Sequence, residues 1–141
     1  MTTTTEPVTT TTLDEATQAR AAYFYIASVA NSAQDLVTSA FPRTGIAWKN
    51  YPSYCAQLAP INEKFAADLT AFTWPATAQD EIATQAGVAA EVAGLYYECS
   101  HDKGTGSALI GVSGRIDNAN ARAAAAASAT RVALGLPVDR G

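Results

Sequence analysis

The segment SALIGVSGRIDNANARAAAAASATRVALGL, residues 107–136, decides the fold of this chain. Small and apolar residues recur in it at alternating intervals of three and four, as on one face of an α-helix. These residues are Leu109, Val112, Ile116, Ala119, Ala123, Ala126, Thr130 and Ala133. Bulky side chains occupy the first half of this face and small ones the second, so the second half has to approach its neighbours closely. The pattern predicts a helix over about residues 107–134 that packs against other helices along its whole length.

The first helix is predicted over about residues 13–41. Thr12 and Glu15 have the spacing of a capping box, in which each side chain bonds a free backbone N–H at the start of the helix. Pro42 ends the helix, because the residue before a proline is restricted to extended conformations. Around Tyr23–Ile26 the sequence is apolar on nearly every side of the helix. This run predicts that the helix is buried on more than one side.

Two middle helices are predicted over about residues 53–73 and 76–100, with Trp74-Pro75 as the hinge of a helical hairpin. Pro60 lies inside the first of them, where it removes a hydrogen bond and predicts a kink or a division into two shorter helices. Four helices joined by short loops predict an all-α, antiparallel four-helix bundle over residues 13–137.

The two ends of the chain lie outside this predicted bundle. Residues 1–12 include eight threonines, and this β-branched residue disfavours helix. We therefore expect a threonine-rich N-terminal arm that is extended or disordered, and a short tail at residues 138–141. An ordered arm would have to be held by another subunit.

Composition excludes some classes of partner. The 141 residues carry a net charge of −4, and the nine basic residues are scattered, so we expect no nucleic-acid partner. No run approaches the roughly 20 apolar residues that span a bilayer, so we expect no transmembrane segment. Charged residues make up only 16% of the chain. A surface so poor in charge favours a protein partner or self-association.

The two cysteines, Cys55 and Cys99, are candidates for a disulfide between the middle helices. Counted along straight helices from the Trp74-Pro75 hinge, they are out of step by roughly 7–8 Å of helix rise. A kink at Pro60 could absorb that difference. The alternative is a pair of buried thiols, which behave as small hydrophobic groups. A bond would indicate an oxidising compartment.

No set of residues in the sequence predicts catalysis. His101 is the single histidine, and a bundle metal site needs several histidines and carboxylates at matched spacings. Lys103–Ser107 is rich in glycine, but its lysine precedes the glycines, unlike that of a phosphate-binding loop. Glu91 and Glu98 share one helix face, and two arginines with the same spacing, Arg115 and Arg122, could bridge to them. We therefore assign no catalytic, cofactor-binding or metal-binding residue, and expect no cofactor.

Aromatic residues are numerous for so alanine-rich a chain. One interpretation is that they fill the core opposite the small-residue helix. The other is a crevice for a ligand or partner, because tyrosine and tryptophan are enriched at interfaces. The candidate patch lies near the cysteine end of the predicted hairpin and consists of Trp48, Tyr51, Tyr54, Tyr96 and Tyr97.

The ending Arg131-Val-Ala-Leu-Gly-Leu-Pro137, which follows an alanine-rich helix, and the Trp74-Pro75 hinge resemble small secreted or lipid-anchored actinobacterial helical proteins. The resemblance covers the layout of residues 13–137. It implies a helical bundle of unknown function at the cell envelope, and it identifies no functional residues. Without that resemblance and a disulfide, the cytoplasm or a larger particle is the expected location.

The leading hypothesis is a non-enzymatic helical-bundle module that binds a protein partner. One alternative is a structural subunit of a larger assembly, such as a virion or another repeating particle, whose N-terminal arm contacts a neighbour. The other is a small-molecule binder that uses an aromatic crevice.

Overall fold

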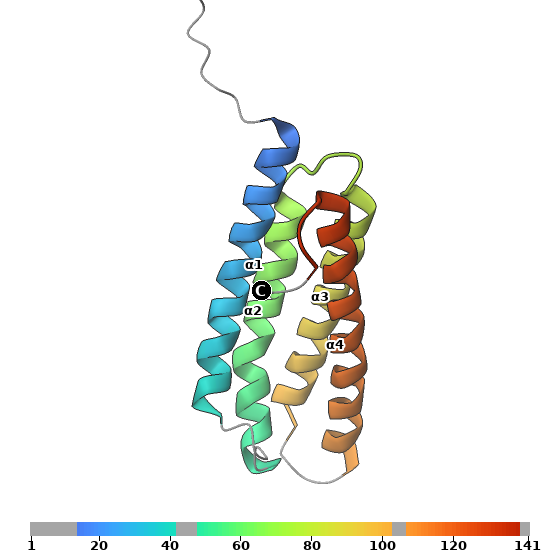
Figure 1. Ribbon diagram of the computed structural model, residues 1–141. Helices are drawn as coiled ribbons and strands as arrows, with labels where there is room; N and C mark the ends of the chain where they lie inside the picture. Colours follow the sequence, from blue (N-terminus) through green and yellow to red (C-terminus); the bar gives the residue numbers. More distant parts are fainter. Residues whose placement is uncertain (1–13, 42–47, 103–106, 139–141) are drawn as a thin grey trace, which may run out of the picture.

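The computed structural model describes residues 14–41, 48–102 and 107–138. In these ranges the chain forms four long helices, α1 (Glu15–Ala40), α2 (Tyr51–Ala71), α3 (Gln79–Ser100) and α4 (Ser107–Leu134), with a short 3₁₀ helix η1 (Trp48–Asn50) before α2. Consecutive helices run in opposite directions (Figure 1). The all-α, antiparallel four-helix bundle predicted from the sequence is therefore confirmed.

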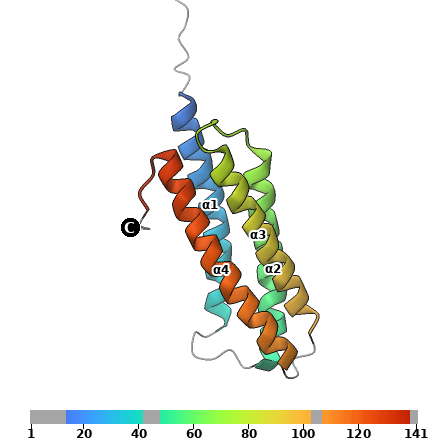
Figure 2. The same ribbon diagram turned by 90° about the vertical axis from the view of Figure 1, so that its right-hand side faces the viewer.

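The helices pack unevenly around the bundle. α2 and α3 share the most extensive contact, α3 and α4 the next, and α1 packs mainly on α2. α1 and α4 contact each other only slightly, so the bundle is loosely closed between them (Figures 1 and 2). None of the described helices is both long and apolar enough to cross a membrane.

The capping box predicted for α1 is wrong. Asp14 is the N-cap, and its side chain accepts a hydrogen bond of 2.7 Å from the backbone N–H of Thr17. Thr12 lies outside the described residues. Aspartate satisfies the same free N–H as threonine, and its negative charge also suits the positive end of the helix. Hydrogen bonds from the side chain and from the backbone N–H of Thr17 lower the pKa of the Asp14 carboxyl group.

Pro60 does not divide α2, which continues from Tyr51 to Ala71. Pro60 and Ala56, whose carbonyl loses its hydrogen-bond donor, are both on the exposed side of the helix. Water can replace the lost donor there, so the proline is tolerated inside the helix.

The hairpin between α2 and α3 turns later than the sequence suggested. Phe72 has left the helix in an extended conformation, with φ −86° and ψ 143°. Trp74 is buried and donates from its indole nitrogen to the carbonyl of Leu69. A turn follows, closed by the bond from Ala78 N to Pro75 O, and α3 begins at Gln79 rather than at residue 76.

α4 has the predicted bounds and buries most of the predicted face, but the prediction that its second half approaches its neighbours closely is wrong on the side of α1, where α4 lines a cavity. Five of its eight seam residues are no more than 2% exposed: Leu109, Val112, Ile116, Ala119 and Thr130. The helix ends where Gly135 takes a φ of 72°, a conformation that favours glycine. Leu136 N then bonds Arg131 O at 2.8 Å, which completes a Schellman-type C-cap.

Two hydrophobic clusters form the core. The lower cluster in Figure 1 surrounds Cys55 and Cys99 and includes Leu58, Val92 and Leu109. The upper cluster surrounds Trp74 and includes Tyr23, Leu69, Ile82 and Leu134. All four helices contribute to both clusters. The division into two clusters leaves a middle layer of the bundle, which holds its largest group of polar core residues.

The prediction that α1 is buried on more than one side near Tyr23–Ile26 is wrong. Tyr23 is 1% exposed, but Phe24 and Tyr25 are 66% and 70% exposed. The reason is the loose closure of the bundle. α2 covers one flank of α1, and α4 covers little of the other.

Candidate functional site

Cys55 and Cys99 form a disulfide, with their Sγ atoms 2.00 Å and their Cα atoms 5.8 Å apart. Both residues are fully buried in the lower cluster. The bond is possible because the hairpin turns near Thr77, which is equidistant from the two cysteines along the chain. An extended residue advances the chain by about 3.3 Å, whereas a helical residue advances it by about 1.5 Å. The non-helical stretch that begins with the extended Phe72 therefore makes up the difference in helix length and brings Cys55 level with Cys99.

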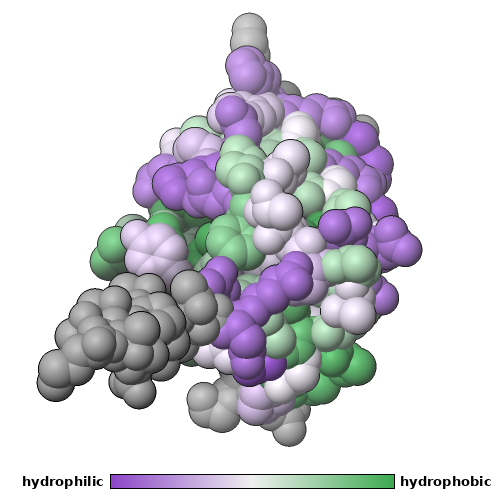
Figure 3. Space-filling view, turned by 90° about the horizontal axis from the view of Figure 1, so that it is seen from above, coloured by the Kyte–Doolittle hydropathy of each residue, from purple (hydrophilic) through white to green (hydrophobic). Residues whose placement is uncertain are grey.

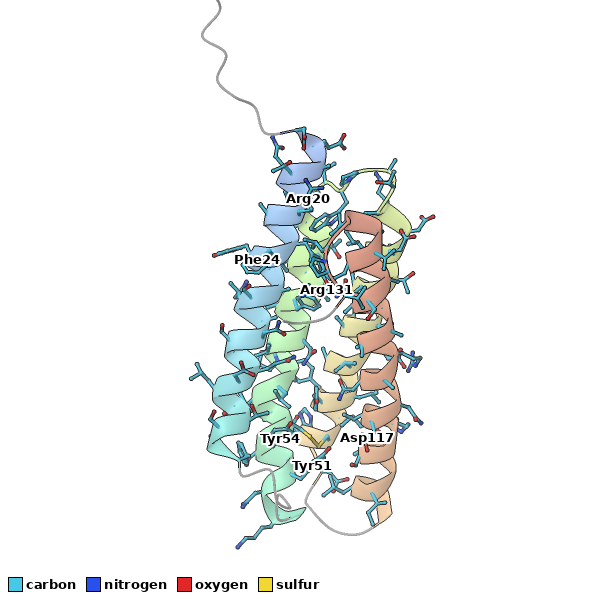
Figure 4. The ribbon with its side chains drawn as sticks, in the orientation of Figure 1. Arg20, Phe24, Tyr51, Tyr54, Asp117 and Arg131 are labelled. Atoms are coloured by element: carbon cyan, nitrogen blue, oxygen red, sulfur yellow. A yellow bond between two sulfur atoms is a disulfide. The ribbon has the colours of Figure 1, made fainter. Side chains whose placement is uncertain are left out.

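The predicted aromatic patch is largely part of the core. Tyr54 lies between Tyr51 and Tyr96, with ring centres 5.8 Å and 6.5 Å away, and Phe41 packs against it at 5.4 Å. Tyr96 is 6% exposed, and its burial raises the pKa of its hydroxyl group to about 12. Figure 4 places Tyr51 and Tyr54 beside the disulfide. The side chain of Trp48 lies outside the described residues.

Tyr97 and His101 are on the outside of α3. Tyr97 is 38% exposed, and a hydrogen bond with Glu63 raises the pKa of its hydroxyl group. A ring nitrogen of His101 lies 2.7 Å from the carbonyl oxygen of Tyr97. The structure therefore does not place Tyr97 with Tyr51, Tyr54 and Tyr96 of the predicted patch.

Two ion pairs join α3 to α4, as the matching spacings predicted. Arg115 donates to both carboxylate oxygens of Glu98, at 2.5 Å and 3.1 Å. Arg122 bonds Glu91 in the same bidentate way, at 2.7 Å and 2.6 Å. These hydrogen bonds lower the pKa of both glutamates. Both carboxylates are therefore engaged in holding α4 against α3.

A cavity of about 210 Å³ lies in the middle layer of the bundle, which we call the central cavity. It lies near the boundary between the two hydrophobic clusters, and two of its lining residues, Tyr23 and Ala27, also belong to the upper cluster. Its walls come mainly from α1 and α4, where the bundle closes loosely. Alanines of α4 line it, among them Ala123 and Ala127, because their side chains are too small to fill the space.

The central cavity has a polar lining. Its polar and charged residues are Tyr23, Asn31, Gln34, Asn62, Gln85, Asn120 and Arg131. Sequence reasoning missed them. Asn62 and Gln85 do carry a signal, because each occupies a position within the apolar stripe of its helix, four residues after Leu58 and three after Ile82. A polar residue at such a position indicates either a buried hydrogen-bond network or a site.

α1 also presents an apolar surface to solvent. Tyr25 and Leu36 are 70% and 75% exposed, and Val29 and Ser32 lie between them on the same stripe of the helix. We call these four residues the outer row of α1. Beside it, a groove of about 240 Å³ between α1 and α2 is lined by apolar residues that include Val29, Ile61 and Phe65.

The end of the bundle at which α1 begins differs from the apolar surface along α1. Figure 3 views the end at which α1 begins, where hydrophobic side chains form separate patches among hydrophilic ones. In the described ranges, no three histidine, cysteine or acidic side chains come together in a way that could hold a metal ion. The central cavity and the outer row of α1 are two features suited to binding, beside a larger and more open apolar pocket of about 830 Å³ along α2 and α3 near Trp74.

Comparisons with models of protein families, with curated proteins and with solved structures found no match. The resemblance to actinobacterial helical proteins stays a prediction.

Proposed function

We propose that the protein is a non-enzymatic binding module that pairs with a second copy of itself through the outer row of α1. The observation that carries this proposal is the exposure of Tyr25 and Leu36 on a helix that the rest of the bundle covers on one flank. Large apolar side chains that cluster on one exposed surface are typical of an interface.

The spacing of the outer row suits two-fold symmetry. Tyr25 and Leu36 are eleven residues apart, about three helical turns, so they lie on one stripe about 16 Å apart. When two copies of α1 pair in antiparallel fashion, Tyr25 of each copy meets Leu36 of the other. Val29 and Ser32 lie at the centre of the pairing, where small side chains let two helices approach within about 8–10 Å.

The charge pattern of α1 supports the same pairing. No charged residue occurs between Ala21 and Gln34. A protein of net charge −4 resists self-association, and this uncharged stretch brings no like charges together. Burying four side chains, two Tyr25 and two Leu36, contributes roughly 6–12 kcal/mol before the cost of association. We therefore expect a dissociation constant in about the micromolar range.

The test is the mass of the full chain in solution, measured by sedimentation equilibrium across that concentration range. The mass should rise from 14.6 kDa toward twice that value. Leu36→Glu should stay monomeric with an unchanged circular dichroism spectrum. Val132→Glu, which alters an equally exposed apolar residue of α4, should dimerise as the wild type does. A wild-type chain that is still monomeric at about 100 μM would contradict the proposal.

The same measurement bears on the alternative of a structural subunit in a larger assembly. That hypothesis invokes the threonine-rich arm at residues 1–12, which lies outside the described residues. An assembly subunit should form species larger than a dimer. Deleting the arm should reduce them to the dimer without affecting the pairing through α1.

A further inference from the structure

One buried carboxamide oxygen in the central cavity lacks a hydrogen-bond donor. Gln85 is 4% exposed, and its Nε2 donates to the hydroxyl group of Tyr23 at 3.0 Å, but its Oε1 has no partner. Asn62 is 8% exposed and also lines the cavity, and its Nδ2 donates to the carbonyl of Leu58 at 3.0 Å. Buried acceptors are normally satisfied, so Gln85 Oε1 calls for a donor inside the cavity.

Arg131 is the one charged residue among those that line the cavity. Its guanidinium carbon lies 5.8 Å from the centre of the Tyr23 ring, and Nη1 donates to the carbonyl of Pro137 at 3.3 Å. No carboxylate of the described residues lies within ion-pair distance of it. Figure 4 shows Arg131 in the upper half of the bundle, where α4 faces α1. A guanidinium group with free donors is suited to a carboxylate.

The hydroxyl group of Tyr23 supplies a second donor. The hydroxyl oxygen of Tyr23 accepts the hydrogen bond from Gln85, so its own proton stays available to an acceptor. The cavity therefore presents donors from Arg131 and Tyr23 and an acceptor from Gln85. This arrangement is complementary to a molecule that is negatively charged at one end and carries a donor at the other.

We propose that the central cavity binds a small organic carboxylate that also carries a hydroxyl or amino group. The carboxylate pairs with Arg131, and the donor group bonds the free oxygen of Gln85, with Asn62 beside it in the cavity lining. A volume of about 210 Å³ limits the ligand to the size of an amino acid or a short 2-hydroxy acid. The same volume also has room for roughly seven waters, which is the competing explanation. The proposal is independent of pairing through α1.

The experiment measures thermal unfolding of the oxidised, full-length chain with small L-amino acids and three- to five-carbon 2-hydroxy acids, each at about 10 mM. The uncharged amides of the same compounds serve as controls, at matched ionic strength. A ligand present at about ten times its dissociation constant should raise Tm by about 5 °C. Its amide should raise Tm much less, because it lacks the charge that pairs with Arg131.

Variants then locate the site. Arg131→Met and Gln85→Leu should abolish the shift, whereas Arg20→Met, which removes an arginine that does not line the cavity, should retain it. In the wild-type chain, the side-chain amide signals of Asn62 and Gln85 should move during an NMR titration, a readout that needs no variant to fold. If no compound changes Tm or these signals, the cavity holds water and the proposal is wrong. Equal binding of acid and amide, or full binding by Arg131→Met, also overturns it.

Discussion

The Cys55–Cys99 disulfide is expected to provide a large share of the stability of the bundle. The bond joins residues 44 positions apart and so restricts the unfolded chain. The loop-closure relation for a loop of this length gives a contribution of about 4 kcal/mol to the free energy of unfolding. Domains of this size have only about 5–15 kcal/mol in total. The double variant Cys55→Ala, Cys99→Ala should therefore remain folded but be markedly less stable.

The expected change in melting temperature follows from the length of the chain. An unfolding entropy of about 2.1 cal/mol/K per residue over 141 residues converts a loss of 4 kcal/mol into a fall in Tm of about 13 °C. Both cysteines are fully buried beside Leu58, Val92 and Leu109. Truncation to alanine also removes packing around them, so the fall should be at least this large.

The assay is equilibrium unfolding in urea, followed by circular dichroism. The double variant should unfold at a lower urea concentration, and its m-value should be higher, because the unfolded chain without a cross-link exposes more surface. Mass spectrometry of the wild-type chain with and without reductant, after unfolding, establishes the bond independently. Variants are preferable to reduction of the folded chain, since the buried sulfurs are shielded from a reductant.

A double variant within about 1 kcal/mol of the oxidised wild type would refute the loop-closure reasoning. If the double variant were as stable as the wild type but had a higher m-value, a stabilising change in the native state would have offset the loss of the cross-link. Two free thiols in the unreduced wild type would contradict the bond itself.

Two further predictions concern the packing of α4 and its ion pair with α3. Ala126→Leu should lower the free energy of unfolding by about 1–3 kcal/mol, because Ala126 is only 7% exposed and a larger side chain has to displace its neighbours. The exposed Ala125→Leu should be near neutral in the same denaturation assay, and equal effects would show that the seam is open. Glu91→Gln should lower Tm at neutral pH, because the bond with Arg122 lowers the pKa of Glu91 and so stabilises the folded chain above the unfolded pKa. This difference in Tm should shrink as the pH falls below the ordinary value of 4.5, and it should disappear once the pH has passed the lowered pKa of Glu91 in the folded chain. Asp117→Asn is the control, because Asp117 is an exposed carboxylate of α4 that forms no ion pair with the described residues. If the difference in Tm between Glu91→Gln and the wild type persisted at low pH, the ion pair with Arg122 would not be its cause.

The sequence predicted the elements of the fold because helix periodicity is local. The seam from Leu109 to Ala133 follows from 3.6 residues per turn, and the structure buries six of its eight residues, while Ala123 lines the central cavity. The spacing shared by the glutamates of α3 and the arginines of α4 similarly indicated that they could pair, and the structure joins them. The sequence left the disulfide as one of two alternatives, because the bond depends on where the chain leaves α2, at the extended residue Phe72, and periodicity does not reveal this.

The sequence did not predict the binding features, because they depend on how tightly the helices close around one another. A run such as Tyr23–Ile26 shows that a helix is apolar, but it does not show which neighbour covers each side. The tertiary structure decided that Tyr23 enters the upper cluster while Tyr25 faces solvent. It also left a cavity lined by alanines where α1 and α4 remain apart. The alanine-rich helix determined that a bundle forms, and the space between α1 and α4 decided where it can bind.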